Sequence, residues 1–175
     1  NITGQSACKW LVMEWDGRES SGIFVGNPIG WLLRNVNSSL ALFKDNGIRS
    51  FSKVLIAIRP GRRNKRFIDV ADKVCRHFGA SLTLLNIVSE SDSNQKIKRT
   101  EKSSSELISE TKSKSVVKII KSNNPVEAIS EESASYDLLI LGTPEKDNWI
   151  SVLFGAGEDR FVKKAACSVL RLTIK

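Results

Sequence analysis

The sequence is poor in the residues that build most catalytic and metal centres. Its 175 residues contain one histidine, His77, and three widely spaced cysteines, Cys8, Cys75 and Cys167. No two thiols have the spacing of a zinc site or a redox pair, and a lone histidine excludes most catalytic triads. We therefore expect reduced, partly buried thiols. We expect His77 in the last turn of a helix, where a cation is favourable.

Long apolar stretches and aromatic clusters are also missing. No run approaches the about 18 apolar residues of a membrane span, and no secretory signal precedes the first predicted strand. Only 7% of the residues are aromatic, and none alternates with basic residues as base-stacking surfaces require, which argues against nucleic acid as a partner. Because the chain begins at Asn1 without an initiator Met, we expect a piece of a larger, cytoplasmic protein.

The charge that is present is basic. The net charge is +8 and the isoelectric point is about 9.6, a balance that favours anionic partners. The densest cluster comprises Arg59, Arg62, Arg63, Lys65 and Arg66. It follows a predicted strand at the sheet edge where open α/β folds bind ligands. A phosphate or lipid headgroup and a merely solvated basic surface remain equal alternatives for this cluster.

Apolar runs alternate with amphipathic segments from residue 51 onward. The runs predict strands at residues 53–58, 82–88, 116–120, 136–141 and 168–172. Apolar residues at helical spacing predict helices at residues 64–78, 95–111, 125–133 and 156–165. This alternation indicates an α/β fold: an open, mostly parallel five-stranded sheet with helices on both faces.

The first fifty residues repeat the end of this pattern. Strands are predicted at residues 10–14 and 39–43, with a helix at 29–36 between them. Twelve positions separate Gly26 from Ser38, and the same number separates Gly155 from Cys167. We therefore divide the chain into three parts. They are the C-terminal half of a first unit (1–46), a linker (47–52) and a complete second unit (53–175).

Three segments of the second unit carry a family resemblance: Leu138–Gly142, Leu153–Ala156 and Val162–Leu170. With the strand order, they resemble the universal stress protein superfamily, whose fold is of the adenine nucleotide alpha hydrolase type. Members that bind ATP carry a glycine, two residues, a second glycine, nine residues and then Gly-Ser or Gly-Thr. Such glycines let the backbone approach phosphates at a helix N-terminus.

The resemblance implies an adenine-nucleotide pocket, with ATP or a related nucleotide as its ligand and no obligatory cofactor. The cofactor-binding residues that it implies are Gly142, Thr143, Gly155, Ala156, Ala57, Ile58 and Arg59. The sequence departs from the pattern at three positions. Glu145 replaces the second glycine, Ala156 replaces the hydroxyl residue, and Arg59 stands where an acidic residue is usual. A carboxylate on the phosphate path repels the ligand, so we expect a degenerate pocket.

Two functions remain open. The first is a cytosolic regulatory and oligomerisation domain of a membrane transporter for amino acids, cations or chloride, with no enzymatic activity. Such a domain would form a homodimer through its terminal strands, beside a covalently linked transmembrane domain. The alternative is a free-standing universal stress protein that binds ATP or AMP, and a nucleotide-hydrolysing enzyme has less support because no nucleophile or base pair is evident. Four tryptophans indicate an interface between the units, a dimer contact or ordinary core packing: Trp10, Trp15, Trp31 and Trp149.

Overall fold

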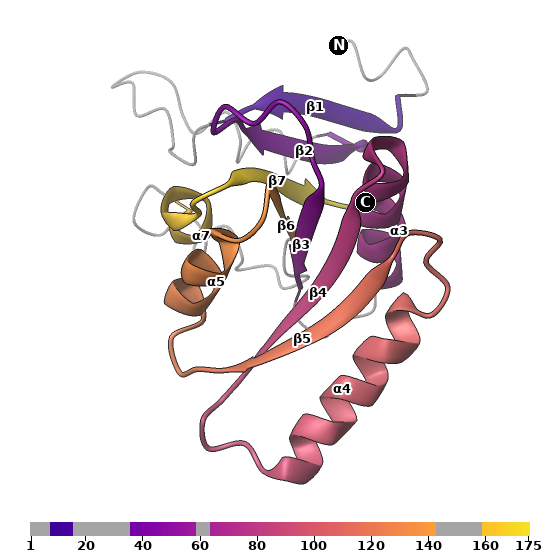
Figure 1. Cartoon of the computed structure of the whole chain (residues 1–175). Coiled ribbons are helices and arrows are strands. Elements are labelled where there is room, and N and C mark those ends of the chain that lie inside the picture. The colour runs from indigo at the N-terminus through magenta and orange to yellow at the C-terminus, as the bar shows by residue number, and fades with distance from the viewer. Residues whose placement is uncertain (1–7, 16–35, 59–63, 143–158) are drawn as a thin grey trace.

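A computed structural model describes residues 8–15, 36–58, 64–142 and 159–175 (Figure 1). The strands are β1 (Trp10–Glu14), β2 (Ser39–Lys44), β3 (Lys53–Ala57), β4 (Ser81–Val88), β5 (Ser115–Lys121), β6 (Leu138–Gly142) and β7 (Ser168–Thr173). The helices are α3 (Asn64–Phe78), α4 (Asn94–Ile108), α5 (Pro125–Ser133) and α7 (Arg160–Lys164). Every strand predicted from the sequence is present, with bounds shifted by no more than two residues.

All seven described strands form one sheet in the order β1-β2-β7-β6-β3-β4-β5. These strands lie in two parallel sets: β1 pairs parallel with β2, while β7, β6, β3, β4 and β5 run parallel with one another. The two sets meet at β2 and β7, which run antiparallel. The mostly parallel sheet of the second unit is therefore confirmed, and the first unit extends it instead of forming a separate sheet.

Helices cover both faces of this sheet (Figure 1). On one face, α3 buries Phe67, Ile68, Ala71 and Cys75 against β3, β4 and β6, and α4 adds Leu107 and Ile108. On the other face, Ile129 of α5 and Val162 of α7 pack against Leu55, Leu139 and Val169. The central strands are apolar on both sides for this reason.

Local signals explain where the helices begin and end. Ser93 caps α4, and Asn124 caps α5 with Pro125 in the first turn. Gly79 ends α3 with a φ of +68°, a conformation that favours glycine. The prediction for α4 was too long at its C-terminal end, because the helix stops at Ile108 and the next three residues turn toward β5.

None of the helices in the described parts of the chain has the length and apolar character that a bilayer crossing requires.

Hydrogen bonds hold the first unit to the second. The Asn46 side chain donates to the carbonyl of Cys167 at 2.8 Å, and its backbone N–H donates to Ser168 Oγ at 2.9 Å. Lys44 Nζ donates to the carbonyl of Val162 at 2.9 Å. In the sheet, β2 lies between β1 and β7, and β7 lies between β2 and β6. Both edges of β2 and both edges of β7 are thus occupied within the chain. The homodimer through terminal strands and the division at residues 46 and 53 stay predictions.

Other residues singled out in the sequence fall mostly in structural positions. Cys75 and Cys167 are buried, whereas Cys8 is exposed. His77 lies in the last turn of α3, as predicted, with its ring 4.8 Å from that of Phe78. Trp15 is buried in the core beside residues of both units, and Trp10 packs against the opposite core cluster. Trp31 and Trp149 lie outside the described residues, as do residues 29–35 of the predicted helix at 29–36. Its last residue, Val36, is described and is not helical.

Asp72 of α3 anchors the turn that leads into β5. Its Oδ1 accepts hydrogen bonds from the backbone N–H groups of Lys112 and Ser113 at 3.0 and 2.8 Å, and its Oδ2 accepts from Arg76 Nε at 3.1 Å. Burial raises the pKa of this carboxyl, but the hydrogen bonds from Ser113 and Lys112 and the charge of Arg76 outweigh it. The pKa of Asp72 is therefore held below its usual range.

Asp72→Asn is expected to lower the free energy of unfolding at neutral pH by about 2 kcal/mol, since hydrogen bonds to a charged group are lost. A carboxyl with a lowered folded-state pKa stabilises the fold above its unfolded pKa, about 4. That contribution disappears as pH falls through the lower folded value, so the wild-type and variant stabilities should converge in acid. Urea unfolding across pH measures this. Asp69→Asn, an exposed change on the same helix, should show no such convergence.

Candidate functional site

The candidate site lies where the carboxyl ends of β3 and β6 meet. From β3 the chain continues outward through β4 and β5, then returns to place β6 on the other side of β3. Parallel sheets bind ligands at such a switch point, in the crevice outside the carboxyl ends of the strands. Ala57 ends β3 and Gly142 ends β6, and Ile58 follows directly after Ala57.

Three of the predicted site residues therefore come together: Ala57, Ile58 and Gly142. A Cβ on Gly142 would lie 3.1 Å from Cγ2 of Ile58 and 3.2 Å from the ring of Phe67. The absence of a side chain at Gly142 thus lets Ile58 and Phe67 pack closely against the end of β6. Ile58 and Gly142 remain partly exposed, while Ala57 and Phe67 are buried beneath them. The described floor is apolar and suits the face of a planar base.

The other predicted site residues, Thr143, Gly155, Ala156 and Arg59, lie outside the described residues. The predicted phosphate-binding residues are among these four. The fit of a nucleotide is therefore judged on Ala57, Ile58 and Gly142, the predicted site residues that the structure describes. There the residues fit, because a base packs well against aliphatic carbon. ATP, if bound, would rest its base on the partly exposed Ile58 and Gly142, which Phe67 supports from below.

The structure adds a pair of buried charges that the sequence predictions missed. Arg171 of β7 pairs with Asp159 at 2.9 Å between Nη2 and Oδ2, and both side chains are buried. Arg171 Nη1 also donates to the carbonyl of Gly142 at 3.3 Å. A cation inside the apolar run Ser168–Thr173 was the signal that could have revealed this pair, since a buried strand excludes an unpaired charge.

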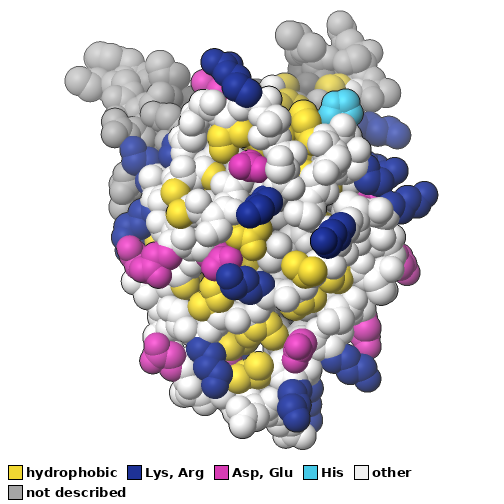
Figure 2. Space-filling view, in the orientation of Figure 1, with side chains coloured by type: hydrophobic (Ala, Val, Ile, Leu, Met, Phe, Trp, Pro, Cys, Tyr) yellow, Lys and Arg dark blue, Asp and Glu magenta, His cyan; other side chains and the backbone are white. Residues whose placement is uncertain are grey.

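The basic cluster is only partly described, and its described members contact the chain itself. Lys65 pairs with Glu110, a contact that raises the pKa of Lys65. Arg66 donates to the carbonyl of Lys175 at 3.1 Å. On the face drawn in Figure 2, Lys and Arg side chains are spread among Asp and Glu instead of forming one continuous basic surface. Neither residue supports a dedicated anion site.

The two buried thiols, Cys75 and Cys167, are poor nucleophiles. Burial is the main cause that raises the pKa of Cys75 to about 11, and the charge of Asp72 adds to it. Burial likewise raises the pKa of Cys167 to about 11. Thiols with such values carry almost no thiolate at neutral pH. Across the described ranges, no group of three or more His, Cys, Asp or Glu side chains could hold a metal ion.

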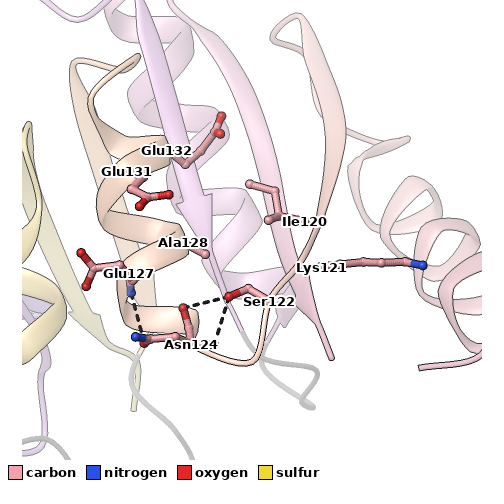
Figure 3. A pocket seen from close by; sticks show the side chains of 8 residues that line it. All are labelled: Ile120, Lys121, Ser122, Asn124, Glu127, Ala128, Glu131 and Glu132. Carbon is pink, nitrogen blue, oxygen red and sulfur yellow. Dashed lines mark hydrogen bonds between the residues drawn. The ribbon is translucent and has the colours of Figure 1, made fainter. Parts of the chain in front are cut away.

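A hollow of about 460 Å³ lies elsewhere, between the end of β5 and the first turns of α5 (Figure 3). Its lining residues are Ile120, Lys121, Ser122, Asn124, Glu127, Ala128, Glu131 and Glu132. Glu127 and Glu132 are paired with Lys164 and Lys118, and Lys121 also lines the hollow, so lysines balance its three carboxylates.

Solved structures of universal stress proteins share this fold. One from Archaeoglobus fulgidus DSM 4304 matches with a TM-score of 0.68 and 17% identity, covering 93% of this chain. The chain spans only 60% of that relative's length. Another from Archaeoglobus fulgidus, solved in complex with dAMP, matches 71% of this chain and 100% of its own length, with 13% identity and a TM-score of 0.55.

A universal stress protein solved in complex with cAMP matches with a TM-score of 0.58 and 14% identity, over 73% of this chain and 100% of its own. No curated protein is similar enough to the chain to match it. The Universal stress protein family model matches residues 50–172, which include β3, β4, β5, β6 and all but the last residue of β7. This chain belongs to the universal stress protein family.

Proposed function

We propose that this chain binds an adenine nucleotide in the crevice at the carboxyl ends of β3 and β6. The observation that carries the proposal is the partly exposed apolar floor that Ile58 and Gly142 form, packed closely on the buried ring of Phe67. Two relatives of the same fold were solved with adenine monophosphates, dAMP and cAMP. Both ligands carry a single phosphate, which matches a site whose sequence has lost two positions that serve a longer phosphate chain.

Calorimetric titration with AMP tests this function. We expect measurable heat with AMP and dAMP and weaker binding of magnesium-ATP, because Glu145 places a carboxylate in the segment that resembles the phosphate loop. Gly142→Ala should weaken AMP binding about tenfold, since its Cβ forces Ile58 and Phe67 to move by a few tenths of an ångström.

The hollow beside α5 provides a matched control for this titration. Glu131→Gln changes the lining of that hollow and leaves the crevice untouched. It should therefore bind AMP as the wild type does. No heat with any adenine nucleotide at high micromolar concentration, or equal weakening by both variants, would contradict the proposed site.

We also propose that the chain acts by binding and not by catalysis. The two buried thiols are protonated at neutral pH, and His77 lies at the opposite end of α3 from the crevice. The hypothesis of a transporter tail, with its membrane partner and cytoplasmic location, receives no support from the matched proteins. The gene sequence upstream of Asn1 would decide it.

A further inference from the structure

A second hollow, of about 520 Å³, lies where the start of β1 and the start of β2 meet α3 and the segment after β7. In Figure 1 the C-terminal end of the chain lies beside α3. A volume of this size is typical of small-molecule sites. The charged residues that line the hollow are Lys9, Arg66, Asp69, Lys73 and Lys175. Four cations face one carboxylate there, and we call this site the basic hollow.

Hydrogen bonds fix the backbone around the basic hollow. The N–H of Ser39 donates to the carbonyl of Lys9 at 3.0 Å, which holds the start of β1 against β2. Arg66 Nη1 donates to the carbonyl of Lys175 at 3.1 Å. The N–H of Lys175 donates to Ser39 Oγ at 3.2 Å. Cations that lie far apart in the sequence are therefore brought to one place by backbone contacts.

One side of α3 supplies the second wall of the basic hollow. Arg66, Asp69, Val70 and Lys73 follow one another at intervals of three, one and three positions, which places them on the same side of the helix. Val70 packs against the core beneath, so this side of α3 is held to the sheet. The guanidinium of Arg66 is engaged by the carbonyl of Lys175, whereas Lys73 lies exposed on the wall.

Two ammonium groups of the basic hollow are available to a ligand. In the part of the chain that the structure describes, the side chains of Lys9 and Lys73 form no ion pair and donate no hydrogen bond. The exposed amide of Asn37, which also lines the hollow, likewise has no described partner. Neighbouring cations repel one another, and an anion placed between them removes that cost.

We propose that the basic hollow binds a small free ligand that carries two or more phosphate groups. Lys9 and Lys73 bind its phosphate oxygens by charge-assisted hydrogen bonds, and the Asn37 amide adds a neutral donor. Several linked phosphates match this wall better than one does, because the cations outnumber the single carboxylate, Asp69. Arg66 acts only by positioning Lys175.

This site is separate from the proposed adenine-nucleotide crevice. Ala57, Ile58, Gly142 and Phe67, which form the crevice, do not line the basic hollow. The ligand would instead bridge the two units, because Lys9 precedes β1 and Lys73 belongs to α3. A ligand that binds only this folded arrangement stabilises it.

Calorimetry with inorganic tripolyphosphate tests the basic hollow. Lys9→Gln and Lys73→Gln should each raise the dissociation constant about tenfold, because each loses a hydrogen bond between charged groups. The matched control is Lys102→Gln, an exposed change on α4 that removes the same charge. Its dissociation constant should stay within about twofold of the wild type, since distant surface charges are screened by salt.

Thermal unfolding gives a second readout. Tripolyphosphate should raise the melting temperature of the wild type and of Lys102→Gln, and raise it less in Lys9→Gln and Lys73→Gln. Gly142→Ala, which alters the crevice, should bind tripolyphosphate as the wild type does. If AMP does not bind but tripolyphosphate does, the proposed function is wrong and the basic hollow stands.

Selective weakening in Lys9→Gln and Lys73→Gln supports the proposal. No heat with tripolyphosphate at millimolar concentration overturns it, and so does equal weakening in all three lysine variants, which indicates a general basic surface. Phosphatidylcholine vesicles that contain phosphatidylinositol bisphosphate distinguish a lipid headgroup from a free compound. Vesicle binding that Lys73→Gln abolishes, without binding of tripolyphosphate, shows that the assignment to a free ligand is wrong.

Discussion

Asp159→Ala is expected to lower the free energy of unfolding by about 3–5 kcal/mol, because it removes the carboxylate that balances a buried arginine. The same change removes the N-cap of α7, whose oxygen accepts from Phe161 and Val162. Both effects act at a residue with no exposed surface. Urea unfolding followed by circular dichroism measures the loss.

The free energies of unfolding of three further variants separate the effect of the buried charge from that of the helix cap. Asp159→Asn keeps an oxygen that can cap the helix, so its loss should be smaller than that of Asp159→Ala by about 1 kcal/mol. Adding Arg171→Met to Asp159→Asn should recover part of the stability, since a neutral pair replaces an unbalanced charge. Glu110→Ala, which breaks the exposed pair with Lys65, should change nothing measurable. A loss in Asp159→Ala no larger than in Glu110→Ala would contradict this account.

Removal of residues 1–46 is expected to convert the remaining chain into a self-associating species. In the full chain β2 covers the edge of β7 along five residue pairs, from Leu40 to Lys44. Deletion leaves that edge open, flanked by apolar residues such as Val169 and Leu172 that β2 and its neighbours had buried. Open, apolar edge strands pair with other chains.

The geometry predicts the kind of pairing. Two copies related by a two-fold axis would align their β7 strands antiparallel, which is the direction in which β2 pairs with β7. Light scattering after gel filtration should therefore show a dimer of residues 47–175, at concentrations where the full chain shows less association. Leu170→Lys in the truncated chain places a charge on this edge and should reduce the dimer. A truncated chain that remains monomeric at high micromolar concentration would falsify the expectation.

The sequence alone determined the elements and their sequence order. Continuous apolar runs such as Val54–Ala57 are typical of a strand buried on both faces, and the prediction was confirmed. The bounds of α3 and α5 followed from local chemistry, because Gly79 and Pro125 favour particular backbone angles whatever surrounds them. The glycine at the end of β6, Gly142, was also found by its pattern, and with it one wall of the crevice.

Only the tertiary structure decided what lies next to what. No local signal shows that β2 runs antiparallel to β7, because strand pairing over more than a hundred positions depends on the packing of the whole sheet. For the same reason, the ion pair of Arg171 and Asp159 could not be predicted. The two residues are twelve positions apart and form a pair only because α7 folds back over β7. Residue type and spacing act locally, so they located the crevice. Its apolar floor and its buried ion pair arise from contacts between distant segments.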